Sequence, residues 1–145
     1  MESKEDTEIK NLNMKPSIVP IPSHTESIAK IILDSAYQVH TALGPGMLES
    51  VYEACLAYEL GLRSIEVKSQ ITLPVVYKGI NVDSGFRLDM LVDGCVIVEI
   101  KASEIINPVY CAQLLTYLKL AKIRLGLLIN FNVVHLRDGI KRIIN

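Results

Sequence analysis

The chain has 145 residues, of which 50% are hydrophobic and 21% are charged, a composition typical of one globular domain with a substantial core. Its 15 lysines and arginines balance 16 acidic residues, so the formal net charge is −1. A chain this close to neutral has no general attraction for nucleic acid, and any such binding must come from a local patch of positive charge.

Cysteines, histidines and hydropathy narrow the classes of protein further. Cys55, Cys95 and Cys111 lie far apart in apolar surroundings, which indicates free thiols in a reducing compartment and predicts a cytoplasmic protein. The three histidines are equally dispersed, a spacing that argues against a structural zinc site. No uncharged stretch reaches the roughly 18 residues of a membrane helix, so no membrane association is expected.

The first third of the chain predicts a flexible arm followed by two helices. Residues 1–22 are charged or contain proline and show no periodicity, so we expect them to form the arm. Ser23 and Glu26 have the spacing of a capping box, and apolar residues then recur at helical intervals as far as Gly44-Pro45-Gly46. A second apolar stripe, from Leu48 to Leu62, predicts the other helix.

The rest of the chain predicts five strands interrupted by one helix. Strand-forming patterns cover residues 65–77, 80–92, 95–102, 124–131 and 140–144. The first three form an antiparallel meander in the simplest arrangement. Asn107-Pro108 predicts the start of a helix that reaches about residue 122, and this helix can carry the chain to a parallel neighbour. The order α-α-β-β-β-α-β-β predicts an α/β fold, with helices flanking a mixed sheet.

Strand alternation brings four charged residues to one end of this sheet. Glu99 and Lys101 share a face of the third β-rich run, and Arg87 and Asp89 share a face of the second. If these runs pair through the Asp93-Gly94 turn, Asp89 lies close to Glu99, and two such carboxylates repel unless a cation or a proton lies between them. Mg²⁺ is bound in this way by carboxylates, a carbonyl and waters. The alternative is a structural cluster in which Lys101 and Arg87 neutralise the two acids.

These residues carry a resemblance to a known group of enzymes. Asp89 followed by Glu99-Ile100-Lys101 on the next strand resembles the D…(D/E)-x-K signature of the PD-(D/E)XK nuclease superfamily. More narrowly, Gly46-Met47-Leu48-Glu49-Ser50-Val51-Tyr52 resembles the motif of the GxxExxY family, and the likeness covers residues 25–145. It implies one domain over residues 23–145 with a restriction-endonuclease-like core. The signature's proline is replaced by Leu88.

Carried over by position, the resemblance implies an active site built from both helices and strands. It assigns metal binding to Asp89, Glu99, the backbone carbonyl of Ile100 and, from the second helix, Glu49. The metal it implies is Mg²⁺ or Mn²⁺. Lys101 would orient or activate the attacking water and stabilise charge on the reacting phosphate.

Two further pairs complete the expected site. Gln113 and Tyr117 form a Q-x-x-x-Y pair on one helical face, which in RecB-type relatives supports the active site and contacts substrate. Tyr52 and Arg87 are weaker candidates for substrate contact. Each has an ordinary structural alternative: Tyr52 is a core aromatic, Gln113 is an amide satisfied by backbone groups, and Glu49 complements the dipole of its own helix.

Two functions from different classes follow. The first is metal-dependent hydrolysis of phosphodiester bonds in nucleic acid, with DNA as the expected substrate and a homodimer or larger nuclease complex as the expected assembly. The second is a non-catalytic module that keeps the nuclease fold and binds nucleic acid or a protein, which the neutral charge and short chain favour. A hydrolase for a small phosphodiester is a third, weaker alternative.

Overall fold

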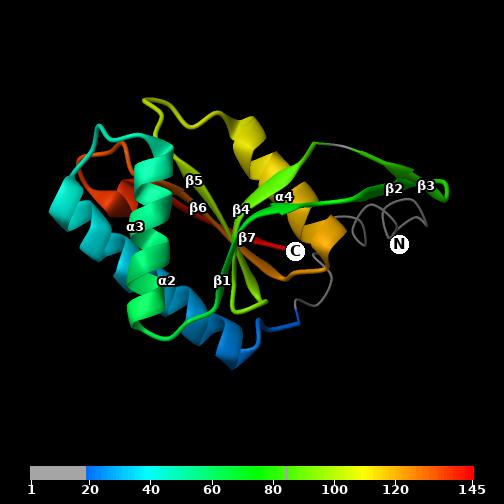
Figure 1. Ribbon diagram of the computed structural model, residues 1–145, viewed down its shortest axis with the longest axis horizontal. Coiled ribbons are helices and arrows are strands. Elements are labelled where there is room, and N and C mark those ends of the chain that lie inside the picture. The colour runs from blue at the N-terminus through cyan, green and yellow to red at the C-terminus, as the bar shows by residue number, and fades with distance from the viewer. Residues whose placement is uncertain (1–18, 84) are drawn as a thin grey trace, which may run out of the picture.

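The computed structural model describes residues 19–83 and 85–145 (Figure 1). Most of the expected arm, residues 1–18, lies outside these ranges. The helices are α2 (Ser23–Leu43), α3 (Glu49–Leu62), α4 (Pro108–Ala121) and the short 3₁₀ helix η1 (Leu136–Gly139). The strands are β1 (Val67–Thr72), β2 (Val75–Tyr77), β3 (Ile80–Val82), β4 (Arg87–Val92), β5 (Val96–Lys101), β6 (Leu125–Asn130) and β7 (Ile140–Ile144).

Five strands form a mixed sheet in the order β1-β4-β5-β6-β7. Strands β5 and β6 are parallel, and the other neighbouring pairs are antiparallel. Helix α4 makes the crossover between the two parallel strands, as a parallel connection requires. The predicted mixed α/β architecture is therefore confirmed.

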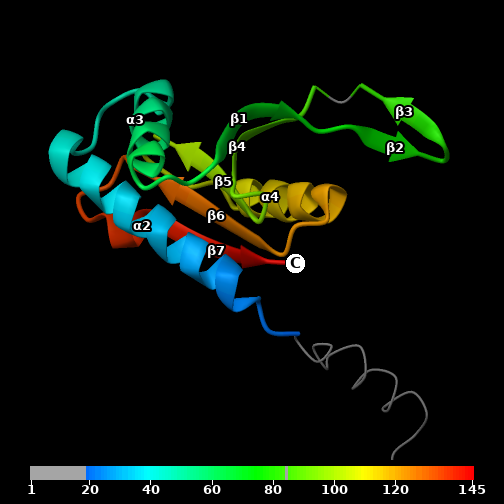
Figure 2. The same ribbon diagram turned by 60° about the horizontal axis from the view of Figure 1, so that its bottom comes forward.

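Helices cover both faces of this sheet. Helices α2 and α3 pack on one face with Met90, Val98 and Leu127, and α4 packs on the other with Ile97 and Leu128 (Figure 2). Every residue of β6 is buried, as are all but the last of β5. These central strands are mainly apolar because both of their faces are covered. Their polar side chains, Glu99 and Lys101 of β5 and Asn130 of β6, all lie in the second half of each strand. No helix in the described ranges has the length and apolar character needed to cross a membrane.

The predicted meander is interrupted by a small hairpin. The first two β-rich runs each divide, and β2 pairs only with β3 in a separate two-stranded sheet that projects from the body (Figure 2). Pro74 has no N–H to donate to a ladder, and Gly85 has a positive φ of 66°, so both runs break there. The N–H of Leu73 still donates to the Phe86 carbonyl at 2.9 Å, which closes the main sheet across the base of the hairpin.

The expected capping box is absent. Helix α2 begins at Ser23, Pro22 occupies the N-cap position, and no side chain caps this end. Glu26 pairs instead with the Arg142 guanidinium of β7, with an Oε2–Nη1 distance of 3.0 Å. The N-cap prediction for α4 is confirmed, since the Asn107 side chain accepts a hydrogen bond from the Val109 N–H at 3.0 Å.

Candidate metal-binding and active site

The site lies where the ladder between β4 and β5 opens. Backbone pairing runs from Val92↔Val96 to Met90↔Val98, and one further step of this register places Asp89 opposite Glu99. There the side chains take over from the backbone: the Asp89 N–H donates to Glu99 Oε1 at 3.2 Å, and the Ile100 N–H donates to Asp89 Oδ2 at 2.8 Å. Each carboxylate is thus held by the neighbouring strand, in the pairing that alternation predicted.

Burial and a neighbouring acid favour the protonated form of Glu99. Glu99 is only 7% exposed and Asp89 is half-buried. Burial, followed by the negative charge of Asp89, raises the pKa of Glu99 to about 8, although Lys101 acts in the opposite direction. The protonated form of Glu99 is therefore favoured near neutral pH, and a divalent cation between the two carboxylates would instead favour the ionised form.

The Ile100 carbonyl is directed toward the same gap. The Lys101 carbonyl accepts a hydrogen bond from the Phe131 N–H at 3.0 Å, so the backbone polar groups of Lys101 face β6. Because these groups alternate in direction along a strand, those of Ile100 face β4. The donation from the Ile100 N–H to Asp89 agrees with this orientation.

Helix α3 brings Glu49 to the end of β5. Glu49 is the first residue of the helix, and its Oε1 accepts a hydrogen bond from the Ala102 N–H at 3.4 Å. The carboxylate oxygens of Glu49, Asp89 and Glu99 do not all lie within 4.8 Å of one another. Direct binding of one ion by all three acids would therefore require Glu49 to move, whereas a bridging water needs no movement.

Tyr52 secures the loop that presents Glu49. Its side chain is fully buried and stacks on Phe131, with ring centroids 4.4 Å apart. The hydroxyl donates to the Gly44 carbonyl at 2.6 Å and accepts from the Met47 N–H at 3.1 Å. Tyr52 is therefore a core aromatic in this structure, and it does not line an exposed surface as a substrate contact would.

Two basic residues lie beside the carboxylates. Lys101 Nζ lies 4.5 Å from the centroid of the Tyr110 ring on α4, a cation–π contact that holds the ammonium at the end of β5. Arg87 is exposed at the first position of β4, two residues from Asp89. Lys101 and Arg87 are thus each two residues from one of the acids along the same strand.

Helix α4 contributes Gln113 and Tyr117 from the opposite face. Burial raises the pKa of the Tyr117 hydroxyl, the charges of Glu99 and Asp89 raise it further, and a hydrogen bond with the Gln113 side chain lowers it. The hydroxyl therefore lies close enough to both acids for their negative charges to affect its ionisation. The structure brings the predicted Q-x-x-x-Y pair to the site, with Gln113 exposed and Tyr117 buried.

A fourth acid, Glu53, was absent from the predicted site. Burial raises its pKa, as do the charges of Asp89 and Glu49, while a hydrogen bond from Gln70 lowers it. Gln70 Nε2 donates to both Glu53 oxygens, at 3.0 and 3.1 Å. The four-residue interval from Glu49 on one helix face could have revealed Glu53.

Gln70 is held in an unusual backbone conformation opposite Asp89. Its φ is 54°, in the left-handed region that few non-glycine residues adopt. The partners Ser69↔Met90 and Ile71↔Leu88 flank it in the β1–β4 ladder. Strained residues of this kind often occur at functional sites. Here the hydrogen bonds from Gln70 to Glu53 join β1 to α3 next to the acids.

Comparison with protein-family models matches residues 26–143 to the PD-(D/E)XK nuclease superfamily. This range includes α3, both acid-bearing strands and α4, and it covers most of the chain, which therefore belongs to that superfamily. Neither the curated proteins nor the solved structures gave a significant match.

Proposed function

We propose that this protein is a metal-dependent nuclease that hydrolyses phosphodiester bonds in nucleic acid, with DNA as the expected substrate, and that it belongs to the GxxExxY family. One observation carries the proposal: Asp89 and Glu99 meet at the opened end of the β4–β5 ladder, where Glu99 is buried and its pKa is raised. The superfamily membership supports it. A purely structural ion-pair cluster would pair each acid with a base, whereas these acids contact each other.

The donor set suits Mg²⁺ or Mn²⁺, which prefer oxygen ligands. Asp89, Glu99 and the Ile100 carbonyl would hold the ion, and Glu49 would complete the site directly or through water. A bound divalent ion supplies a water of lowered pKa and neutralises charge on the scissile phosphate.

The remaining residues act on substrate and water. Lys101 orients the attacking water and stabilises the charge that develops on the phosphate. The Tyr117 hydroxyl, oriented by Gln113, maintains the position of the two acids on the α4 side, and Gln113, which is exposed, contacts substrate. Arg87 is exposed and binds a neighbouring phosphate. Because the whole chain is nearly neutral, these local cations provide its attraction for the phosphate backbone. We expect a homodimer or a larger nuclease complex to supply the remaining contacts with nucleic acid.

Metal binding and cleavage test the proposal together. We expect Mg²⁺ or Mn²⁺ to bind by calorimetry and to support cleavage of plasmid DNA or of single-stranded DNA or RNA. Asp89→Asn, Glu99→Gln and Lys101→Met should each lower the cleavage rate about 100-fold or more, and the first two should also weaken metal binding. Glu104→Gln, an exposed acid just beyond the strand, is the matched control.

Metal binding without cleavage of any of these substrates would contradict the nuclease proposal and favour the non-catalytic module. One observation favours that second function: Val76, Tyr77 and Ile80 are 61%, 61% and 64% exposed on the β2–β3 hairpin. Apolar side chains gathered on a projecting element suit a protein contact. Free Cys55, Cys95 and Cys111 agree with a cytoplasmic location for either function.

A further inference from the structure

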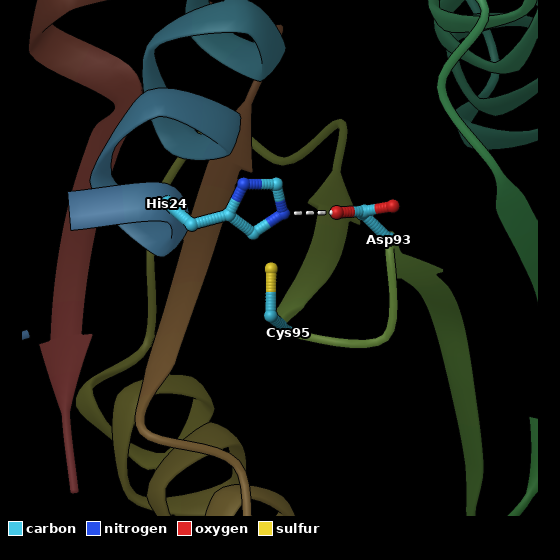
Figure 3. A group of neighbouring side chains, drawn as sticks. All are labelled: His24, Asp93 and Cys95. Carbon is cyan, nitrogen blue, oxygen red and sulfur yellow. Dashed lines mark hydrogen bonds and ion pairs between the residues drawn. The ribbon is translucent and has the colours of Figure 1, made fainter. Parts of the chain in front are cut away.

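A second group of metal-ligating side chains lies at the other end of the acid-bearing strands. It consists of His24 in the first turn of α2, Asp93 in the β4–β5 turn and Cys95 just before β5 (Figure 3). His24 Nε2 and Asp93 Oδ2 are 2.5 Å apart, and all three ligand atoms lie within 4.8 Å of one another. The fold thus joins residues whose spacing in the sequence indicated no such site.

The backbone fixes two of the three residues. Asp93 and Gly94 have φ values of 51° and 65°, the positive pair that a tight hairpin turn requires. The Asp93 N–H donates to the Glu66 carbonyl at 2.8 Å, and the Cys95 N–H donates to the Val92 carbonyl at 3.1 Å. Because both backbone positions are held, both side chains leave this rigid turn in defined directions, and they point toward His24 (Figure 3).

The third residue comes from an anchored helix end. Thr25, next to His24, is only 6% exposed, and Ile28 is part of the main core. The His24 side chain itself is 69% exposed and that of Asp93 is 33% exposed. The helix end is therefore fixed, while the imidazole and the carboxylate have room to adjust.

We propose that His24, Asp93 and Cys95 bind a zinc ion. A thiolate and an imidazole favour Zn²⁺ over Mg²⁺, and three protein ligands leave a fourth tetrahedral position for water. Ligands about 2.0–2.3 Å from one ion lie roughly 3.3–3.8 Å apart. The imidazole and carboxylate must therefore separate slightly, and the thiol, within 4.8 Å of both, needs at most a small shift. On binding, the Sγ–H bond breaks, an Sγ–Zn bond forms, and the proton passes to solvent.

This site is distinct from the carboxylate site. Asp93 follows Asp89 by four residues on one side of the hairpin, and Cys95 precedes Glu99 by four on the other. At about 3.3 Å per residue the two sites are roughly 13 Å apart along the strands. One site offers only oxygen ligands, which suit Mg²⁺ or Mn²⁺. The other offers sulfur, nitrogen and oxygen, which suit Zn²⁺. Zinc would tie the start of α2 to the β4–β5 hairpin.

Cobalt and zinc titrations of the untagged, full-length, reduced protein test the proposal. We expect one equivalent of Co²⁺ to produce a thiolate-to-cobalt charge-transfer band, and Zn²⁺ to abolish it by displacement. Cys95→Ser should remove the band, and His24→Gln should weaken Zn²⁺ binding at least tenfold. The matched controls Cys111→Ser and His135→Gln should bind Zn²⁺ as the wild type does.

Two more variants test ligation independently of Cys95 and separate the zinc site from the carboxylate site. Asp93→Asn retains a residue that tolerates the positive φ of the turn, so it reports on ligation even if Cys95→Ser fails to fold, and it too should weaken Zn²⁺ binding at least tenfold. The double variant Asp89→Asn/Glu99→Gln should keep the charge-transfer band, which separates this proposal from the nuclease proposal. Absence of the band in the wild type, or its survival in Cys95→Ser, would overturn the zinc site.

Discussion

At the residue scale, the most informative group is the Glu99 carboxyl. It lies in an apolar layer beside Asp89, and both burial and that neighbour raise its pKa to about 8. Between about pH 4.5 and 8 the folded protein therefore holds a proton that the unfolded chain has released. Because the folded state binds more protons in this range, stability must fall as the pH rises through it.

This linkage predicts the pH dependence of the metal-free protein. In EDTA, the free energy of unfolding should be lower at pH 8.5 than at pH 5, and Glu99→Gln should reduce the difference because the amide does not ionise. Addition of Mg²⁺ should stabilise the wild type more at pH 8.5, where it does not compete with the proton. Urea denaturation at both pH values measures these effects. An equal pH dependence in Glu99→Gln and in the exposed control Glu66→Gln would contradict the assignment.

The residues of the site were predictable to different degrees. Alternation along two strands and one turn dipeptide was enough to bring Asp89 to Glu99, because both rules act over short range. Glu53 was missed although its four-residue spacing from Glu49 could have indicated it. Its hydrogen bonds from Gln70 could not be foreseen, because the left-handed backbone of Gln70 in a strand has no signature in the sequence. The backbone hydrogen bonds to Asp89 and Glu99 could not be predicted either, since these N–H groups are available only because the ladder opens there.

At the element scale, the helices and strands with long periodic patterns were predicted correctly. The N-terminal end of α2 and the break within the first two β-rich runs were not. The helices and the parallel crossover follow from periodicity and from the Asn107-Pro108 start of α4. The capping box at Ser23 was wrong because Pro22 occupies the N-cap position and Glu26 pairs with Arg142, a residue 116 positions away. Pro74 marked the break between β1 and β2, but nothing local indicated that the separated halves would form a hairpin of their own.

A close approach between elements gives a prediction at this scale. A Cβ atom on Gly139 would lie 2.1 Å from the Asn130 carbonyl oxygen, whereas a Cβ on Gly61 would have no atom within 4 Å. Gly139→Ala should therefore cost about 1–3 kcal/mol or more, since neither backbone can move freely. Gly61→Ala in α3 should be neutral or stabilise by up to about 1 kcal/mol. Urea denaturation measures both, and equal stability of the two variants would contradict the described packing.

On the scale of the whole molecule, the sheet and the β2–β3 hairpin are separable parts. The sheet has helices on both faces, while the hairpin projects beyond them (Figure 2). Most apolar side chains of the hairpin are exposed. The overall class of fold was predictable because the order of elements leaves few arrangements of a sheet with one parallel crossover. The projection was not, because it depends on which of two possible ladders the divided strands join.

Removal of the hairpin should leave the body intact. The Leu73 N–H already bonds to the Phe86 carbonyl at 2.9 Å, so an Asn-Gly turn replacing residues 74–85 can join these two positions. We expect the free energy of unfolding to change by no more than about 1 kcal/mol and Mg²⁺ binding to be unchanged. Denaturation and calorimetry check both. Loss of cooperative unfolding would show instead that the hairpin belongs to the core.

The opened ladder between β4 and β5 also bears on how such a chain can evolve. The buried Glu99 and the half-buried Asp89 occupy positions where an uninterrupted backbone ladder and apolar side chains would be more stable, so the pair of acids is expected to lower the stability of the fold. A duplicated copy released from selection for metal binding would gain stability by exchanging Asp89 or Glu99 for an apolar residue. Under the proposed function, retention of both acids is the expected mark of selection for the metal that they bind.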